Sequence, residues 1–294
     1  MSSKALSTED IEEITRRVLG SRKYASMKLP PETVKDLIQQ EIAVGKSPKD
    51  VEKAMREKLH QIIAPYLGDP DYAAEEENLL RAAAEGDEAV RNWCLRMLSV
   101  HTSSRERIPQ MAEFYRAIFE RIGTPESILD VACAFNPFAF PWMGLPESTA
   151  YHAYDLHTPR VHLINSFFKI YGLEPSAETR DILLNPPGTE ADTAFFFKEA
   201  HRFESRKKGC NRDFWISLPV KTIVVTLPAE NLTGQHQMRD RQRNLISKNI
   251  DGLGWTFEET EIAGEMIFII DKHRSALPPE LSAQRLEPAE ESSD

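Results

Sequence analysis

The sequence predicts an α/β protein in which an all-helical region precedes a parallel sheet. Residues 1–124 carry apolar side chains at helical spacing without a strand pattern, whereas short apolar runs alternate with helical patterns over 125–274. Of the 294 residues, 41% are hydrophobic, which is enough to fill a sizeable core and excludes a globally disordered chain. We therefore expect a helical domain at 1–124, an α/β domain at 125–274 and a disordered acidic tail at 275–294.

Proline, glycine and capping residues divide the helical region into successive helices. Ser7 and Asp10 form a capping pair ahead of the first helix, and Gly20 ends that helix. Pro31 and Pro48 open the second and third helices, at a position where the missing proline amide costs nothing. Three further helical patterns follow, and they begin near residues 71, 87 and 108.

The second region alternates between strand and helix patterns. Strands are expected at 127–132, 150–155, 182–184, 213–218, 223–225, 255–261 and 266–270, and helices at 161–168 and 194–200. In a sheet of this kind, a ligand binds beyond the carboxyl ends of the parallel strands.

Charge is distributed unevenly along the chain. Thirty-six Lys and Arg against 46 Asp and Glu give a net charge of −10, which argues against a non-specific nucleic-acid binder. Residues 1–60 and 201–274 nevertheless each hold 12 basic and 10 acidic side chains, whereas residues 125–200 hold 4 and 10. The two basic stretches could meet phosphate, and the acidic centre suits a cationic or neutral ligand.

Cysteine usage and hydropathy indicate the compartment. Cys94, Cys133 and Cys210 contain no CxxC pair, so we expect neither a disulfide framework nor a zinc knuckle. The sequence has no run of 18 apolar residues, and its polar start does not resemble a secretory leader. We therefore expect a cytoplasmic protein without a membrane span.

A turn of small residues follows the first expected strand. Asp130 to Pro137 forms this turn, and Asp155 ends the second strand some 20 residues later. This layout is typical of an adenosine-binding unit, in which the acid binds ribose hydroxyl groups. The usual glycines are absent, and Ala132 and Ala134 cannot take positive φ cheaply. A pyrophosphate dinucleotide would need those glycines, so the acidic block favours the sulfonium of S-adenosyl-L-methionine; a plain strand and loop is the alternative.

Two other segments are weaker signals. Asn185-Pro186-Pro187 is similar to the motif of amino-methyltransferases, but Gly188 stands where that motif has an aromatic residue, and a proline turn is the alternative. Arg105 and Arg107 bracket a helix start and could bind a carboxylate, with a solvated capping turn as the alternative. The histidines show no metal-ligand spacing, and neither a Ser/His/Asp pattern nor a P-loop is present, so we expect no metal site.

Several short motifs stand in one order along the chain. They are Ser21-Arg-Lys-Tyr24, Pro31-Glu-Thr-Val34, His101-Thr-Ser-Ser-Arg-Glu-Arg107, Asp130-Val-Ala-Cys-Ala-Phe-Asn136-Pro137, Tyr154-Asp155, Asp181-Ile-Leu-Leu-Asn-Pro-Pro187, Phe197-Lys198, Ser217-Leu-Pro-Val-Lys-Thr222 and a closing hairpin with Glu265. Over about residues 20–272, this set resembles the aminoglycoside-resistance 16S rRNA (guanine(1405)-N7)-methyltransferase family. Two departures are Ala134, which replaces a glycine, and a longer segment at 224–238.

The resemblance implies a class I (Rossmann-like) methyltransferase domain with a seven-stranded sheet and S-adenosyl-L-methionine as its cofactor. Arg107, with Arg105, would hold the cofactor carboxylate, and Asp155 would bind the ribose. Asp181 would lie beside the adenine amine. The implied cofactor residues are Arg105, Arg107, Ala132, Ala134, Asn136, Asp155, Asp181 and Ile182.

The resemblance also implies a substrate, 16S rRNA within the assembled 30S subunit, and a helical N-terminal domain that docks on it as part of a monomer. Lys198 and Lys221 would face the target base, while exposed cations of the N-terminal domain would contact phosphates. The implied RNA-binding residues are Arg22, Lys23, Lys28, Lys198 and Lys221. Guanine N7 carries no proton, so no catalytic acid or base is expected.

Three alternatives remain open from the sequence. The target could be another base, such as adenine at N1, or the chain could be a weak or inactive methyltransferase fold that only binds the small subunit. The aromatic residues near the turn could stack on a flipped base or belong to the core. They are Phe135, Phe138, Trp142 and the phenylalanines at 195–197.

Overall fold

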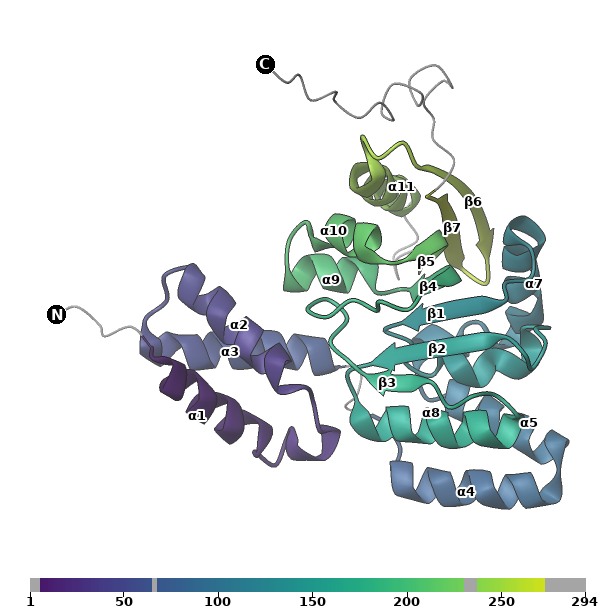
Figure 1. Cartoon of the computed structure of the whole chain (residues 1–294), viewed down its shortest axis with the longest axis horizontal. Coiled ribbons are helices and arrows are strands. Elements are labelled where there is room, and N and C mark those ends of the chain that lie inside the picture. The colour runs from purple at the N-terminus through teal and green to yellow at the C-terminus, as the bar shows by residue number, and fades with distance from the viewer. Residues whose placement is uncertain (1–5, 65–67, 230–236, 273–294) are drawn as a thin grey trace, which may run out of the picture.

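A seven-stranded sheet forms the centre of the computed structural model, which describes residues 6–64, 68–229 and 237–272 (Figure 1). The strands are β1 Ser127–Val131, β2 Ala150–Asp155, β3 Ala177–Thr179, β4 Ala191–Phe197, β5 Val220–Pro228, β6 Thr256–Ile262 and β7 Glu265–Asp271. Their order is β3-β2-β1-β4-β5-β7-β6. Strands β1 to β5 pair in parallel, and β7 runs antiparallel to both β5 and β6. The predicted seven-stranded α/β sheet is confirmed.

Helices precede the sheet and cover both of its faces (Figure 1). The α-helices are α1 Thr8–Leu19, α2 Pro31–Ala43, α3 Pro48–Ile63, α4 Tyr72–Glu85, α5 Asp87–Leu98, α6 Thr102–Arg105, α7 Met111–Ile122, α8 Thr158–Tyr171, α9 Ala200–Arg206, α10 Cys210–Ser217 and α11 Gln237–Ile250. The 3-10 helices are η1 Ala25–Met27, η3 Ile108–Gln110 and η4 Asn136–Trp142. The predicted capping box is present, because the Asp10 amide donates to Ser7 Oγ (3.2 Å) and the Ser7 amide donates to Asp10 Oδ2 (2.8 Å). Among the described helices, none is long and apolar enough to cross a bilayer.

Successive residues of the central strands enter two different cores, which is why these strands are apolar almost throughout. We call the core beneath α4, α5, α7 and α8 the first core and the core beneath α9, α10 and α11 the second core. In β4, Phe195 belongs to the first core, whereas Ala194 and Phe196 belong to the second. The same alternation holds in β7, where Ile267 and Phe268 face opposite sides. Burial on both faces fixes the register of these strands.

The helices that precede the sheet fall into two groups. Helices α1 to α3 enclose a third core of their own, with Val34, Leu37 and Met55 fully buried. Helices α4, α5 and α7 instead share the first core of the sheet, to which Trp93 and Phe114 contribute. Separate packing therefore ends after α3, and we call residues 6–63 the N-terminal module and residues 68–229 and 237–272 the sheet domain. The division at residue 124 stays a prediction.

Two strand predictions were wrong. Residues 182–184 form a turn, in which the amides of Leu184 and Asn185 both donate to the Asp181 carbonyl (3.1 and 2.8 Å). The third strand is the preceding short segment, β3. Residues 213–218 lie mostly in helix α10, because Phe214, Trp215 and Leu218 have helical spacing and together enter the second core.

The helix prediction at 194–200 was also wrong. Most of this segment is β4, and α9 begins only at Ala200. The run of phenylalanines fits a pleated strand with a core on each face, which outweighs the pattern read as helical. The predicted tail at 275–294 lies outside the described residues.

Candidate active site

A cavity of about 290 Å³ lies beyond the carboxyl ends of β1 and β2. Figure 1 shows these strands pointing toward α3, and residues of α3 form one wall of the cavity. Five of the predicted cofactor residues line it, namely Ala132, Ala134, Asp155, Asp181 and Ile182. Arg105, Arg107 and Asn136 are not among the lining residues. The cavity occupies the place that the fold class predicts for a ligand.

The turn after β1 adopts the conformation for which glycine is usual. Ala132 has φ of 55° and Ala134 has φ of 47°, both in the left-handed region. This region costs an L-residue about 1–2 kcal/mol, and hydrogen bonds of the turn offset part of that cost. The Ala134 amide donates to Asp155 Oδ2 (3.1 Å), and the Cys133 amide donates to the Tyr154 carbonyl (2.9 Å). The alanines therefore do not prevent the turn from forming.

Asp155 ends β2 with its carboxylate 3% exposed and at the cavity wall. Oδ2 accepts from the Ala134 amide and from Arg160 Nη1, each at 3.1 Å. Oδ1 accepts from the His157 amide at 2.9 Å. A carboxylate has about four acceptor positions, so one position on Oδ1 remains for a ligand hydroxyl group. This geometry suits the ribose contact predicted for Asp155.

Asp181 lies at the cavity wall, but other residues already occupy its carboxylate. Arg206 donates to both oxygens (2.9 and 2.6 Å), Thr33 Oγ1 donates to Oδ2 (2.6 Å), and the Leu183 amide donates to Oδ1 (3.2 Å). All four acceptor positions are thus filled. The predicted contact with an adenine amine would have to displace one of these donors, and the carboxylate instead joins α2 to α9.

The predicted carboxylate-binding arginine is buried behind the cavity. Arg107, 4% exposed, donates through Nε and Nη2 to Glu265 (2.6 and 3.0 Å) and through Nη1 to Asn136 Oδ1 (3.2 Å). Two of its five N–H groups have no bond to these two residues. Arg105 is exposed and donates to Thr102 Oγ1 (3.1 Å). Arg107 thus clamps the chain before α7 to the start of β7.

The two lysines predicted beside the target base lie in different places. Lys198 Nζ points inward and contacts Glu265 Oε1 (2.9 Å) and Glu106 Oε2 (2.8 Å), next to the Arg107 clamp. Lys221 lies near the amino end of β5, whereas the cavity lies at the carboxyl ends of the strands, and Lys221 pairs with Asp192 (2.8 Å). The structure does not bring Lys221 to the candidate site.

The three predicted RNA-binding cations of the N-terminal module flank η1 in the chain. Arg22, Lys23 and Lys28 are all exposed. Lys23 Nζ contacts His60 Nδ1 (3.0 Å), and the Lys28 carbonyl accepts from Thr158 Oγ1 at the start of α8 (2.6 Å). This group therefore lies where the N-terminal module meets the sheet domain.

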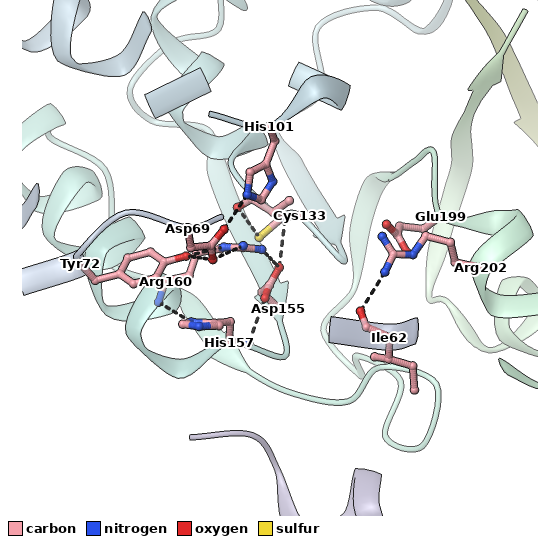
Figure 2. A network of polar contacts seen from close by, with 11 residues as sticks. Ile62, Asp69, Tyr72, His101, Cys133, Asp155, His157, Arg160, Glu199 and Arg202 are labelled. Carbon is pink, nitrogen blue, oxygen red and sulfur yellow. Dashed lines mark hydrogen bonds and ion pairs between the residues drawn. The ribbon is translucent and has the colours of Figure 1, made fainter. Parts of the chain in front are cut away.

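Several charged residues of the cavity wall were not predicted from the sequence, among them Glu199 and Arg202. Figure 2 shows them across from Asp155. Burial raises the pKa of Glu199 to about 7, which the charge of Arg202 opposes and that of Asp155 reinforces. Arg202 Nη2 donates to the Ile62 carbonyl near the end of α3 (2.8 Å). A correct assignment of β4 as a strand would have placed Glu199 at its carboxyl end and marked it as a site residue.

The aromatic residues near the turn belong to the core. Phe135, Phe138, Phe195 and Phe196 are each at most 1% exposed, and Phe197 packs against the first core. Trp142 is partly buried beneath the guanidinium of Arg91 (4.9 Å to the ring centroid). Four of these six rings are therefore enclosed by protein.

Several known proteins are similar to this chain along nearly its whole length. The 16S rRNA (guanine(1405)-N(7))-methyltransferase of Frankia casuarinae is 32% identical over 270 residues, which cover 88% of this chain and 93% of that protein. The 16S rRNA methylase RmtB is 27% identical, with a TM-score of 0.70 over 90% of this chain and 98% of that one. The 16S rRNA methyltransferase RmtF, solved with S-adenosyl-L-homocysteine, shares the fold at 24% identity, with a TM-score of 0.73 over 91% of this chain and 99% of that one.

The model of the family "Ribosomal RNA methyltransferase (FmrO)" matches residues 20–269, which include α2 and α3 of the N-terminal module and all but the end of the last strand of the sheet. The chain therefore belongs to the FmrO family of ribosomal RNA methyltransferases.

Proposed function

We propose that this protein transfers a methyl group from S-adenosyl-L-methionine to N7 of guanine 1405 in 16S rRNA and thereby confers aminoglycoside resistance. The observation that carries the proposal is the match with a relative of that activity over 88% of this chain, at 32% identity. The cavity at the carboxyl ends of β1 and β2 supports it, because every residue that lines this cavity lies within the part of the chain that matches the family.

The cavity residues fit S-adenosyl-L-methionine. Asp155 has an acceptor position left for a ribose hydroxyl group, and the small turn of Ala132 and Ala134 leaves room beside it. Asp155 and Glu199 place acidic groups around a ligand whose sulfur is positively charged. When bound, the cofactor supplies an electrophilic methyl group on that sulfur.

The residues of this chain act by placement rather than by proton transfer. Guanine N7 offers a free lone pair, so no side chain has to remove a proton. Asp155 orients the ribose, and the wall from α3 excludes water on one side of the cavity. Ordered placement of two reactants can supply about 7–11 kcal/mol of a barrier. The guanine must also leave its stack, which costs a few kcal/mol.

The substrate within this proposal is 16S rRNA in the assembled 30S subunit, approached by a monomer in the cytoplasm. Arg22, Lys23 and Lys28 are exposed, and the Lys28 carbonyl bonds to Thr158 at the junction with the sheet domain. Phosphate contacts from such a group orient a protein on RNA without reading its sequence. The N-terminal module would thus dock while the sheet domain presents the cofactor.

Reconstitution tests the proposal. Purified protein, S-adenosyl-L-methionine and unmethylated 30S subunits should yield N7-methylguanine at position 1405, detected by mass spectrometry of rRNA fragments. Asp155→Ala should abolish it because the ribose contact is lost, whereas Arg116→Met on the exposed face of α7 should not. Cells that express the active chain should grow in 4,6-disubstituted deoxystreptamine drugs such as gentamicin. Methylation of naked RNA alone, or of an adenine N1, would overturn the target assignment.

A binding protein without activity is the second candidate, and the alanine at position 134 is what favours it. The turn nevertheless forms, with the Ala134 amide bonded to Asp155. Calorimetry separates the candidates, since an inactive docking protein would bind 30S subunits but not S-adenosyl-L-methionine.

A further inference from the structure

Arg160 is a fully buried cation that no step of the proposed reaction uses. Arg160 lies in the first turn of α8, and its side chain is 0% exposed and contacts Asp155, the predicted ribose ligand. Figure 2 shows it between Asp69 and Asp155. A buried charge is expensive unless it is paired and hydrogen-bonded, so each contact of this guanidinium has a consequence for the site.

The guanidinium bridges two carboxylates from distant parts of the chain. Nη1 donates to Asp155 Oδ2 (3.1 Å), and Nη2 donates to Asp69 Oδ2 (2.7 Å). Nε donates to the Tyr72 hydroxyl oxygen (3.1 Å), and that hydroxyl in turn donates to Asp69. The guanidinium also stacks over the Phe135 ring, 4.8 Å from its centroid. The planar group is therefore held on several sides.

Asp69 is itself held in place from a third segment. His101 Nε2 lies 2.6 Å from Asp69 Oδ1, and His101 also lines the cavity. Burial raises the pKa of the Asp69 carboxyl, but the hydrogen bond with His101 and the charge of Arg160 bring it below its usual value. Asp69 thus stays anionic, and its charge balances that of Arg160. The guanidinium can therefore orient Asp155 as well, because it has a carboxylate partner on each side.

These contacts decide which lone pair Asp155 offers. Arg160 and the Ala134 amide fill both positions on Oδ2, and the His157 amide fills one on Oδ1. The single remaining position is on Oδ1, and Asp155 is one of the residues that line the cavity. We propose that Arg160 is a positioning residue that fixes Asp155 so that Oδ1 accepts a ribose hydroxyl group of the cofactor. This inference rests on the function proposed above.

Two ligands of the whole protein separate this role from a merely structural one. One is S-adenosylhomocysteine, and the other is its analogue without the 2′ and 3′ ribose hydroxyl groups. Calorimetry on the wild type should show about tenfold weaker binding of the analogue, the size expected for one lost hydrogen bond to a charged group. Arg160→Met should weaken S-adenosylhomocysteine by a similar factor and bind the analogue as the wild type does. The control Arg116→Met should leave both affinities unchanged.

The possible outcomes are distinct. Equal weakening of both ligands by Arg160→Met, no weakening of either, or a wild type indifferent to the hydroxyl groups would each overturn the positioning role. A wild type that binds neither ligand would contradict the proposed function instead. If Arg160→Met does not fold, Arg160→Lys takes its place, because one ammonium cannot reproduce the two-sided fork and should also lose the hydroxyl preference.

A measurement on the wild type needs no variant. Exchange of the Arg160 guanidinium protons, followed by NMR, should slow when S-adenosylhomocysteine is added and stay unchanged with the analogue. Identical slowing by both ligands would contradict the inference.

Discussion

Asp155 and Glu199 line one cavity; Asp155 ends β2, and Glu199 follows β4, the two strands that flank β1. Glu199 is 22% exposed at its side chain and pairs with Arg202 at 3.3 Å. Because burial raises its pKa to about 7, its charge changes within the physiological range, whereas a carboxyl in water is ionised well below it. Ionised Glu199 adds negative charge beside Asp155, in a cavity that Lys58, Arg180, Arg202 and Arg206 also line.

Binding of the charged cofactor should therefore depend on pH through Glu199. S-adenosylmethionine carries a sulfonium and S-adenosylhomocysteine does not, so the ratio of their affinities should shift toward S-adenosylmethionine as pH rises through about 7 and Glu199 ionises. Calorimetry between pH 6 and 8 measures the ratio, with about half a unit between points. Glu199→Gln should flatten the profile. An unchanged profile in that variant would remove Glu199 from the explanation.

Backbone strain in the turn predicts an unusual response to glycine. Ala134→Gly should leave the free energy of unfolding unchanged or raise it by up to about 1 kcal/mol, since relief at φ 47° offsets the extra freedom of the unfolded chain. Ala134→Val should lower it by about 1–3 kcal/mol, because a β-branched residue is poorly tolerated there. Urea denaturation measures both.

Ala112→Gly on the exposed side of α7 is the matched control, and it should cost up to about 1 kcal/mol. Equal losses at positions 112 and 134 would contradict the strain at the turn.

At the scale of elements, the cavity is shared between two separately packed parts. The wall from α3 includes Lys58, Gln61 and Ile62. Arg202 of α9 reaches the Ile62 carbonyl at 2.8 Å, and so helps to satisfy the last carbonyls of that helix. A ligand in the cavity therefore contacts both α3 and the sheet domain.

Cofactor binding should accordingly slow amide hydrogen exchange at the end of α3. Local opening of α3 away from the sheet exposes its last turns, and a bound ligand opposes this opening. Mass spectrometry with and without S-adenosylhomocysteine should show added protection in α3 and none in β6, the edge strand across the sheet. Uniform protection of all elements would contradict a specific link.

Element boundaries were predictable where single residues set them. Pro31, Pro48 and the Ser7 cap all mark helix starts in the structure. The errors came from short apolar runs, in which a buried strand and a buried helix look alike. Reading residues 194–200 as a helix hid the carboxyl end of β4, and with it Glu199.

Part of the candidate site was also predictable from single residues in the sequence. Asp155 could be identified because a strand, a turn and an acid recur at a set spacing. The support behind it could not, since Asp69 and Arg160 lie 91 positions apart and meet only in the folded chain. The four hydrogen bonds that Asp181 accepts likewise depend on the folded chain, because one donor is Thr33 in α2 of the N-terminal module.

At the scale of the whole molecule, a polar cluster lies inside the first core. Asp130 is 1% exposed and accepts from the Tyr151 hydroxyl (2.6 Å) and Asn136 Nδ2 (2.9 Å). Burial raises its pKa to about 7, although these two hydrogen bonds act in the opposite direction. Between about pH 4 and pH 7, the folded protein therefore holds a proton on Asp130 that the unfolded chain has released.

This proton makes global stability depend on pH. The contribution is fully present below about pH 4 and is lost as pH rises through about 7, with a slope of at most about 1.4 kcal/mol per pH unit. Compared with Asp130→Asn, the wild type should lose free energy of unfolding between pH 5 and pH 8, within about that slope, as measured by urea titration. Parallel curves for the two proteins would contradict a buried protonated Asp130.

The separate core of α1 to α3 bears on how such enzymes can be re-engineered. Its attachments to the sheet domain include the Thr33–Asp181 bond, the Arg202 bond to the Ile62 carbonyl, and the packing of Leu156 against its apolar interior. A chimera could therefore receive these helices as one block from a relative with different exposed side chains. The transplant must preserve a hydroxyl at position 33 and a recess for Leu156, because Leu156 and Asp181, the partner of Thr33, also line the cavity.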